Sequence, residues 1–178
     1  MDRRLLAGAY DRSAEGYDER FRELQRAKFR AAAPFLAAPP GALCLDAGGG
    51  TALLLEWARE ERPDLASCRW LAIDLSLGML RIARTRGALL AAADLARPPL
   101  RPRSCGLVCA FTSILDDAPR ALRELATLVA PGGTLAASFL EAEAPPAVHL
   151  DGMRVAVSAA AGQDRVFVLR KGRSAQRE

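Results

Sequence analysis

The run Asp46-Ala47-Gly48-Gly49-Gly50 constrains the fold of this chain more than any other segment. It joins an apolar stretch, 42–46, to an amphipathic stretch, 51–61, and so predicts a strand that turns sharply into a helix. Glycine permits tight turns and close approach of a ligand to the backbone. The N-terminus of the following helix offers free N–H groups and the positive end of a dipole. Because three consecutive glycines exceed what a turn needs, this run indicates a nucleotide-like ligand.

The same alternation of short apolar runs and amphipathic segments continues along the chain, which is typical of a parallel sheet with crossover helices. We expect strands at 42–46, 70–74, 88–93, 107–111 and 134–139, helices at 10–36, 51–61, 77–86 and 118–129, and a terminal hairpin over 153–170. Pro131-Gly132-Gly133 is expected to end the last helix before the fifth strand. The predicted fold class is α/β, Rossmann-like, with a seven-stranded, mostly parallel sheet, helices on both faces and a C-terminal antiparallel hairpin.

Length and composition exclude several other classes of protein. A chain of 178 residues, 51% hydrophobic and 26% charged, is expected to form one globular domain rather than a disordered segment. It has no apolar run long enough to span a membrane, and its first residues turn polar too soon for a signal peptide. We therefore expect a cytoplasmic protein.

The cysteines and the single histidine argue against a metal site. Cys44, Cys68, Cys105 and Cys109 form no CxxC pair, and His149 is the only histidine, so we expect no bound metal. The cysteines are predicted to be small buried hydrophobes, with a disulfide as the alternative.

The net charge of +4 permits a polyanionic partner without requiring one. The basic residues gather in two clusters: Arg97, Arg101 and Arg103, and then Arg170, Lys171, Arg173 and Arg177. Neither cluster is interleaved with aromatic residues, which stacking on single-stranded nucleic acid would need. The two clusters can therefore be interpreted either as solvated surface or as a surface that binds phosphate.

Three acidic residues stand at the ends of three successive predicted strands, on the rim where open α/β sheets bind ligands. Asp74 is placed to accept hydrogen bonds from ribose hydroxyls, and Asp94 to meet an adenine edge. Asp46 would repel a pyrophosphate and would suit a ligand carrying an ammonium or sulfonium group. A nicotinamide-dependent oxidoreductase is the weaker alternative, because Leu53 occupies the third glycine position of its G-x-G-x-x-G motif.

Taken together, these segments resemble class I S-adenosylmethionine-dependent methyltransferases, in the ubiquinone/menaquinone-biosynthesis-like subgroup (methyltransferase domain 11/25 type). The resemblance rests on the segments 43–52 (LCLDAGGGTA), 71–76 (LAIDLS), 93–94 (AD), 121–125 (ALREL) with 131–135 (PGGTL), and Tyr10-Asp11 with Tyr17-Asp18. It implies the class I methyltransferase fold, and S-adenosylmethionine as cofactor with S-adenosylhomocysteine as product.

By this resemblance, Asp46 and the glycine backbone would face the methionine portion of the cofactor and Asp74 its ribose. The full set of implied cofactor-binding residues is Tyr10, Tyr17, Asp46, Ala47, Gly48, Gly49, Gly50, Asp74, Leu75, Met79, Ala93, Asp94, Leu95, Phe111 and Thr112. Tyr10 and Tyr17 would close over the cofactor, or else pack helix against core. We expect a single domain, 1–178, with an N-terminal helical lid (1–40), a Rossmann-like core (41–171) and a flexible tail (172–178).

The methyl acceptor is not determined by these motifs. Ala52 replaces the last motif glycine, a change expected to narrow the approach of the cofactor slightly, and the segment after the fifth strand is short. A small metabolite, RNA or a protein therefore remains the candidate acceptor, and a partner protein is a candidate for completing the site. A catalytically silent cofactor-binding subunit that needs such a partner is the alternative function.

Three residues are weak candidates for a catalytic base: Asp116, Asp117 and His149. Asp117 is better suited to cap the helix that follows it, with Pro119 in the first turn. His149 lies in the shortened segment and is better suited to a structural or exposed position than to the role of a base.

Overall fold

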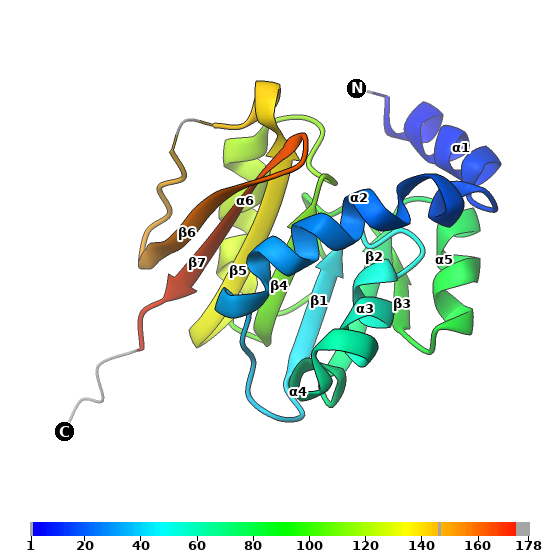
Figure 1. Cartoon of the computed structure of the whole chain (residues 1–178). Coiled ribbons are helices and arrows are strands. Elements are labelled where there is room, and N and C mark those ends of the chain that lie inside the picture. Colours follow the sequence, from blue (N-terminus) through cyan, green and yellow to red (C-terminus); the bar gives the residue numbers. More distant parts are fainter. Residues whose placement is uncertain (1, 146, 174–178) are drawn as a thin grey trace.

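The computed structural model describes residues 2–145 and 147–173, so most of the predicted tail, 174–178, lies outside the described residues (Figure 1). The strands are β1 Leu43–Ala47, β2 Arg69–Asp74, β3 Leu89–Ala92, β4 Cys105–Phe111, β5 Val129–Leu140, β6 Met153–Ala161 and β7 Asp164–Lys171. The helices are α1 Arg3–Ser13, α2 Tyr17–Ala32, α3 Leu53–Glu61, α4 Pro63–Ala66, α5 Leu77–Thr85 and α6 Ala118–Leu128, with 3-10 turns at Ala33–Phe35 and Glu141–Glu143. Within the described ranges, no helix is long and apolar enough to cross a membrane.

The seven strands form one sheet in the order β3-β2-β1-β4-β5-β7-β6. β1 pairs in parallel with both β2 and β4, so the chain order reverses between β1 and β4. β7 runs antiparallel to β5, and β6 antiparallel to β7, as expected for the terminal hairpin. The predicted fold class is therefore confirmed. The carboxyl ends of β1 and β4 form the switch point at which such sheets bind ligands.

Alternating side chains of each central strand build a core on each face of the sheet. Cys44 faces a cluster that includes Phe29 of α2 and Trp57 of α3, whereas Leu45 faces a cluster with Leu125 of α6. Accordingly, α2 and α3 lie on one side of the sheet and α6 on the other (Figure 1).

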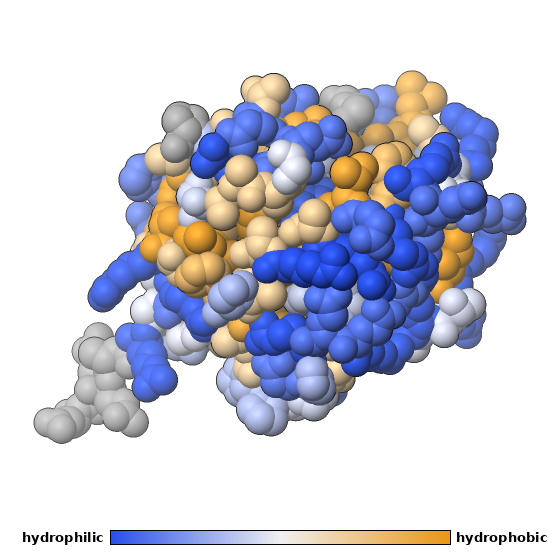
Figure 2. All heavy atoms as spheres, viewed as in Figure 1, coloured by the Kyte–Doolittle hydropathy of each residue, from blue (hydrophilic) through white to orange (hydrophobic). Residues whose placement is uncertain are grey.

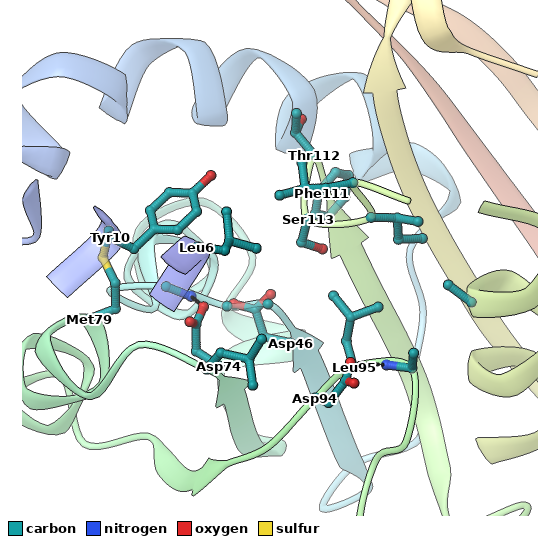
Figure 3. Close-up of a pocket in the computed structure, with 18 of the residues that line it drawn as sticks. Leu6, Tyr10, Asp46, Asp74, Met79, Asp94, Leu95, Phe111, Thr112 and Ser113 are labelled. Atoms are coloured by element: carbon teal, nitrogen blue, oxygen red, sulfur yellow. Dashed lines mark hydrogen bonds between the residues drawn. The ribbon is translucent and has the colours of Figure 1, made fainter. Parts of the chain in front are cut away.

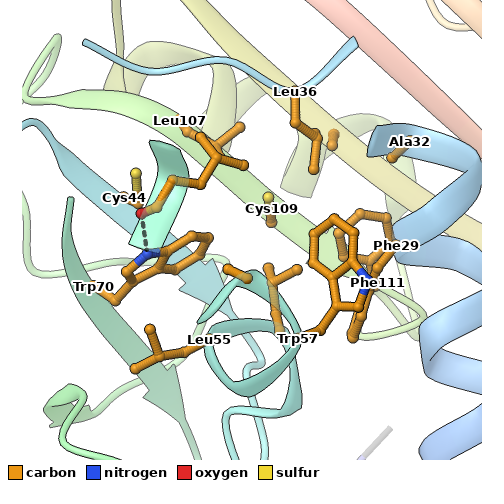
Figure 4. Close-up of a cluster of buried hydrophobic side chains, with 14 of the residues drawn as sticks. Phe29, Ala32, Leu36, Cys44, Leu55, Trp57, Trp70, Leu107, Cys109 and Phe111 are labelled. Atoms are coloured by element: carbon orange, nitrogen blue, oxygen red, sulfur yellow. Dashed lines mark hydrogen bonds between the residues drawn. The ribbon is translucent and has the colours of Figure 1, made fainter. Parts of the chain in front are cut away.

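Aromatic side chains pack α2 against α3 and the sheet. The Phe29 ring lies 5.6 Å from that of Trp57 and 5.1 Å from that of Phe111, centroid to centroid (Figure 4). The four cysteines are buried free thiols, so the expectation of small buried hydrophobes is confirmed.

The N-terminal region differs from the single helix expected over 10–36. It forms two helices, and Gly16 is the residue that precedes α2. Glycine is a weak helix former, and the break lets Asp11 turn toward α5. The Asp11 carboxylate accepts hydrogen bonds from the Ser76 hydroxyl (2.6 Å) and from the Gly78 N–H (2.7 Å). These contacts fasten α1 to the beginning of α5.

One glycine-related expectation needs correction. Pro131-Gly132-Gly133 lies within β5 rather than before it, and the pairing of β4 with β5 shifts register between Cys105 and Leu107. A side chain on Gly133 would come within 2.8 Å of the Gly106 carbonyl, so close backbone approach explains that glycine.

Ala52, which stands in place of the last motif glycine, has a left-handed conformation with φ of 62°. Because glycine adopts this conformation without strain and alanine does not, the replacement strains the backbone at the start of α3.

Candidate functional site

A cavity of about 530 Å³ opens at the carboxyl ends of the central strands, beneath α1 and α2 (Figure 3). Its lining contains every predicted cofactor-binding residue except Ala47, whose carbonyl accepts a hydrogen bond from the Ser113 hydroxyl (2.7 Å). Asp116 and Asp117 also line the cavity, whereas His149 is exposed and lies outside the lining. The residues brought together come from seven separate segments: Tyr10, Tyr17, Asp46–Gly50, Asp74–Met79, Ala93–Leu95, Phe111–Thr112 and Asp116–Asp117.

Asp46 is the most unusual group in this cavity. Its side chain lies beside Asp74 and is only 6% exposed (Figure 3). Burial, and then the neighbouring Asp74, raise the pKa of Asp46 to about 7. Within the described residues, its carboxylate receives no hydrogen bond and makes no ion pair. A buried carboxylate without a partner is costly, so this arrangement favours a cationic ligand.

The glycine run is held by its own backbone contacts. The N–H groups of Gly48 and Gly49 both donate to the Ile73 carbonyl, at 2.8 and 3.1 Å. They are therefore not free to bind a phosphate. A Cβ at Gly48, where φ is +68°, would lie 2.3 Å from the Ser113 Cβ, and one at Gly49 would lie 2.8 Å from the Asp46 carboxylate. Glycine is required here because β1, β4 and Asp46 approach one another so closely.

Asp74 connects the glycine run to α5. One carboxylate oxygen accepts from the Gly50 N–H (2.9 Å) and the other from the Ser76 N–H (2.8 Å). Each oxygen keeps a further lone pair, so ribose hydroxyls can still donate to it. Burial raises the pKa of Asp74, and the two backbone donors partly offset this effect. Ser76 caps α5 as predicted, since its hydroxyl accepts from the Met79 N–H.

Asp94 is less available than expected. Its carboxylate accepts from the Ala96 N–H (2.9 Å) and pairs with Arg3 of α1. The same guanidinium group comes within 3.9 Å of Asp116. Arg3 and Leu6 of α1 therefore join the lining, and no sequence signal had pointed to them.

The two predicted tyrosines come from different helices but meet at the cavity. Their ring centroids lie 6.5 Å apart. The Tyr17 hydroxyl accepts a hydrogen bond from Gln25 (3.1 Å), and burial raises the pKa of Tyr17 to about 12. Both rings are thus neutral surfaces above Asp74.

A buried polar network behind Thr112 escaped the sequence analysis. The Lys28 ammonium lies 2.6 Å from the Thr112 hydroxyl, which donates to Asp164 at 2.7 Å and lies 3.0 Å from the Ser138 hydroxyl. Thr112 itself has a left-handed conformation with φ of 49°. One signal was present: the chain has 25 basic residues, and all but Lys28 and Lys171 are arginine. A compact ammonium fits a buried site where a guanidinium fork would not.

The candidate bases are placed in three different ways. Asp117 caps α6, because its carboxylate accepts from the Arg120 N–H (3.3 Å). Asp116 is half exposed at the cavity mouth, near Arg3. His149 is exposed in the segment after β5.

Comparison with known proteins fits this geometry. A methyltransferase domain family matches residues 45–137. Malonyl-[acyl-carrier protein] O-methyltransferases are similar in sequence: that of Pseudescherichia vulneris is 31% identical over 153 residues, covering 84% of this chain and 59% of that protein. That of Pectobacterium atrosepticum is 33% identical over 144 residues, covering 78% and 54%. The chain spans 54–59% of the length of the curated relatives it matches.

Solved structures share the fold at low sequence identity. A chain of the Haloferax volcanii complex between the Trm112 methyltransferase activator and a methyltransferase has a TM-score of 0.73 at 15% identity, covering 92% of this chain and 97% of that one. A S-adenosylmethionine-dependent methyltransferase of Thermotoga maritima has a TM-score of 0.67 at 17% identity, covering 91% and 98%. The cavity, the motif and the family match agree, and this chain belongs to the methyltransferase domain family of S-adenosylmethionine-dependent methyltransferases.

Proposed function

We propose that the chain is a methyltransferase that methylates a carboxylate oxygen of a malonyl-type acyl group carried as a thioester. The observation that carries the cofactor half of the proposal is the buried Asp46 carboxylate, which has no partner among the described residues. The acceptor half is supported by the curated relatives, which are named malonyl-[acyl-carrier protein] O-methyltransferases.

The described residues fit S-adenosylmethionine. Asp46 suits its ammonium group, because the carboxylate lies in a poorly solvated cavity where an opposite charge is strongly favoured. Asp74 keeps lone pairs for the ribose hydroxyls, while Leu75 and Met79 supply apolar surface beside the adenine. The other predicted cofactor-binding residues in the lining, among them Tyr10 and Thr112, complete the walls of the cavity. The region 1–40 then acts as a lid on the 41–171 core, within a single domain.

A carboxylate acceptor suits the positions of two candidate bases, since Asp117 caps α6 and His149 lies outside the cavity lining. S-adenosylmethionine supplies an electrophilic methyl group, and its transfer to a carboxylate oxygen gives a methyl ester and S-adenosylhomocysteine. A carboxylate is already an anion at neutral pH, so no residue has to remove a proton from it. What the protein must supply is placement of the acceptor, which contributes much of the rate enhancement in such reactions. Arg97 and Arg120 line the cavity and can attract that anion.

Titration calorimetry with S-adenosylmethionine, S-adenosylhomocysteine and NAD tests the cofactor assignment on the wild type and on Asp74→Ala. We expect micromolar binding of both sulfur ligands, no binding of NAD, and a loss of at least about tenfold in the variant, equivalent to about 1.4 kcal/mol. Binding of NAD alone would contradict the assignment.

Mass spectrometry of a malonyl thioester after incubation with S-adenosylmethionine tests the acceptor. A mass gain of one methyl group that alkaline hydrolysis removes would identify the ester. Cofactor binding without any transfer would instead support a catalytically silent subunit that depends on a partner protein.

A further inference from the structure

Five exposed arginines lie in the loop before β4 and on α6, two of them at the cavity, and we call them the arginine face. They are Arg97, Arg101 and Arg103 in the loop before β4, and Arg120 and Arg123 on α6. A groove of about 380 Å³ runs between this loop and α6. Arg97 and Arg120 line both this groove and the main cavity, so the two hollows adjoin at these residues.

The loop that carries three of these arginines is fixed in place. The Arg103 N–H donates to the Thr127 carbonyl at the end of α6 (2.8 Å), and Lys171 of β7 donates to the neighbouring Ala126 carbonyl (2.8 Å). Arg103 lowers the pKa of Lys171, after burial, because the two like charges are close. The positive charge of the arginine face therefore continues toward the end of β7.

On the opposite side of the molecule, several arginines form ion pairs. Around α2 and α3, arginines pair with acids within 4.0 Å: Arg22 and Arg26 with Glu56, Arg30 with Glu61, Arg62 with Asp64, and Arg86 with Asp18. Figure 2 shows a dense hydrophilic area on the right half of this face and apolar areas on its left half. No ion pair joins any member of the arginine face to the rest of the described chain. The arginine face thus combines five exposed arginines with no ion pair among the described residues, whereas most arginines around α2 and α3 are paired with acids.

We infer that the arginine face docks an acidic carrier protein, which presents its thioester-bound acyl group to the cavity. This inference rests on the proposed function, and it assigns the partner surface that the proposal lacks. Unpaired arginines are enriched at protein interfaces and bind carboxylates in bidentate fashion. The groove adds apolar contacts through Pro98, Leu100 and Pro102.

An acidic protein fits this face better than a nucleic acid does. Base stacking needs exposed aromatic rings, but among the large exposed hydrophobics of the described chain the one aromatic residue is Phe21, on α2. The groove side chains are mostly proline, leucine and arginine, together with Ala96, Glu124 and Thr127. A phosphate backbone would gain nothing from the apolar side chains of the groove, whereas a protein can pack against them.

The decisive experiment measures binding of an acyl carrier protein to the wild type and to charge-reversal variants by fluorescence anisotropy. The test variant is Arg101→Glu/Arg123→Glu, which spares the two arginines that line the cavity. The matched control is Arg84→Glu, an exposed helical arginine of α5 without an ion pair in the described structure. Thermal unfolding confirms that each variant is folded.

We expect the double variant to bind the carrier protein at least about tenfold more weakly, mainly through slower association and a reduced salt dependence. Arg84→Glu should bind within about twofold of the wild type. Equal binding by all three proteins, or no binding by the wild type, would overturn the inference. A wild type that prefers a short RNA duplex over the carrier protein would also overturn it.

Transfer assays separate this inference from the proposed function. With the small malonyl thioester of N-acetylcysteamine as acceptor, the double variant should keep the wild-type rate, whereas its KM for the malonyl carrier protein should rise about tenfold. If the wild type methylates neither acceptor but still binds the carrier protein through Arg101 and Arg123, the proposed acceptor is wrong and the docking surface stands. If the wild type and every variant methylate both acceptors equally well, the proposed acceptor is supported and the proposed docking surface is wrong.

Discussion

The ammonium nitrogen of Lys28 lies 3.6 Å from a carboxylate oxygen of Asp164, and both side chains are at most 4% exposed. The pair links α2 to the first residue of β7, and the Thr112 hydroxyl bridges the two groups. Burial lowers the pKa of Lys28, and the neighbouring Asp164 opposes this effect. The network fixes the turn after β4 that forms part of the cavity wall.

Breaking this pair should be strongly destabilising. Lys28→Met leaves Asp164 buried without a counter-charge, and we expect a loss of about 3–5 kcal/mol in the free energy of unfolding, measured by urea denaturation. Lys28→Met/Asp164→Leu should recover most of that loss, because no buried charge then remains. The control is Lys171→Met, the other lysine, which should cost about 1 kcal/mol through loss of one hydrogen bond. Equal losses for the two lysine variants would refute the special role of the pair.

Asp46 should destabilise the protein in the absence of ligand. Its folded pKa of about 7 is above the unfolded value of about 4, so the folded state binds an extra proton between these two values. Its contribution to stability is therefore largest below about pH 4 and falls as pH rises toward 7. We expect Asp46→Asn to gain more than about 1.4 kcal/mol over the wild type at pH 8, the equivalent of one pKa unit. Thermal unfolding at pH 5 and pH 8 measures this, and a gain that is larger at pH 5 would contradict the assignment.

The same group should make cofactor affinity depend on pH. Because the ammonium group of S-adenosylmethionine requires an ionised carboxylate, its affinity should fall below about pH 7, approaching tenfold per pH unit. Calorimetry from pH 5.5 to 8.5 provides the profile. Asp46→Asn should bind weakly with little pH dependence. A wild-type profile that stays flat through this range would mean that Asp46 does not contact the ammonium group.

Gly48 should be irreplaceable for a reason that differs from ordinary turn strain. Gly48→Ala forces a methyl group against Ser113, 2.3 Å away, whereas Gly41→Ala at a similar φ of +72° meets nothing within 4 Å. Both variants carry the left-handed strain, about 1 kcal/mol. We expect Gly48→Ala to lose at least about 2 kcal/mol more and to lose cofactor binding, as measured by urea denaturation and calorimetry. If the two variants behave alike, close packing does not explain the glycine.

The sequence alone determined the elements whose causes are local. Strand periodicity and the glycine run predicted the sheet, its hairpin and the turn after β1, and the side chains of Ser76 and Asp117 identified two helix starts. The acids at the strand ends predicted the rim, because parallel strands bring their carboxyl ends to one edge.

Only the tertiary structure decided features that depend on contacts between distant segments. The attachment of α1 to α5 depends on the contacts of Asp11 with Ser76 and Gly78, which no local pattern contains. The burial that raises the pKa of Asp46, and the pairing of Lys28 with Asp164, arise when separate helices and strands exclude water together. The arginine face likewise differs from the paired arginines of α2 only through which acids the fold brings near. These effects depend on the distances between groups in space, and those distances cannot be read from the spacing of residues along the sequence.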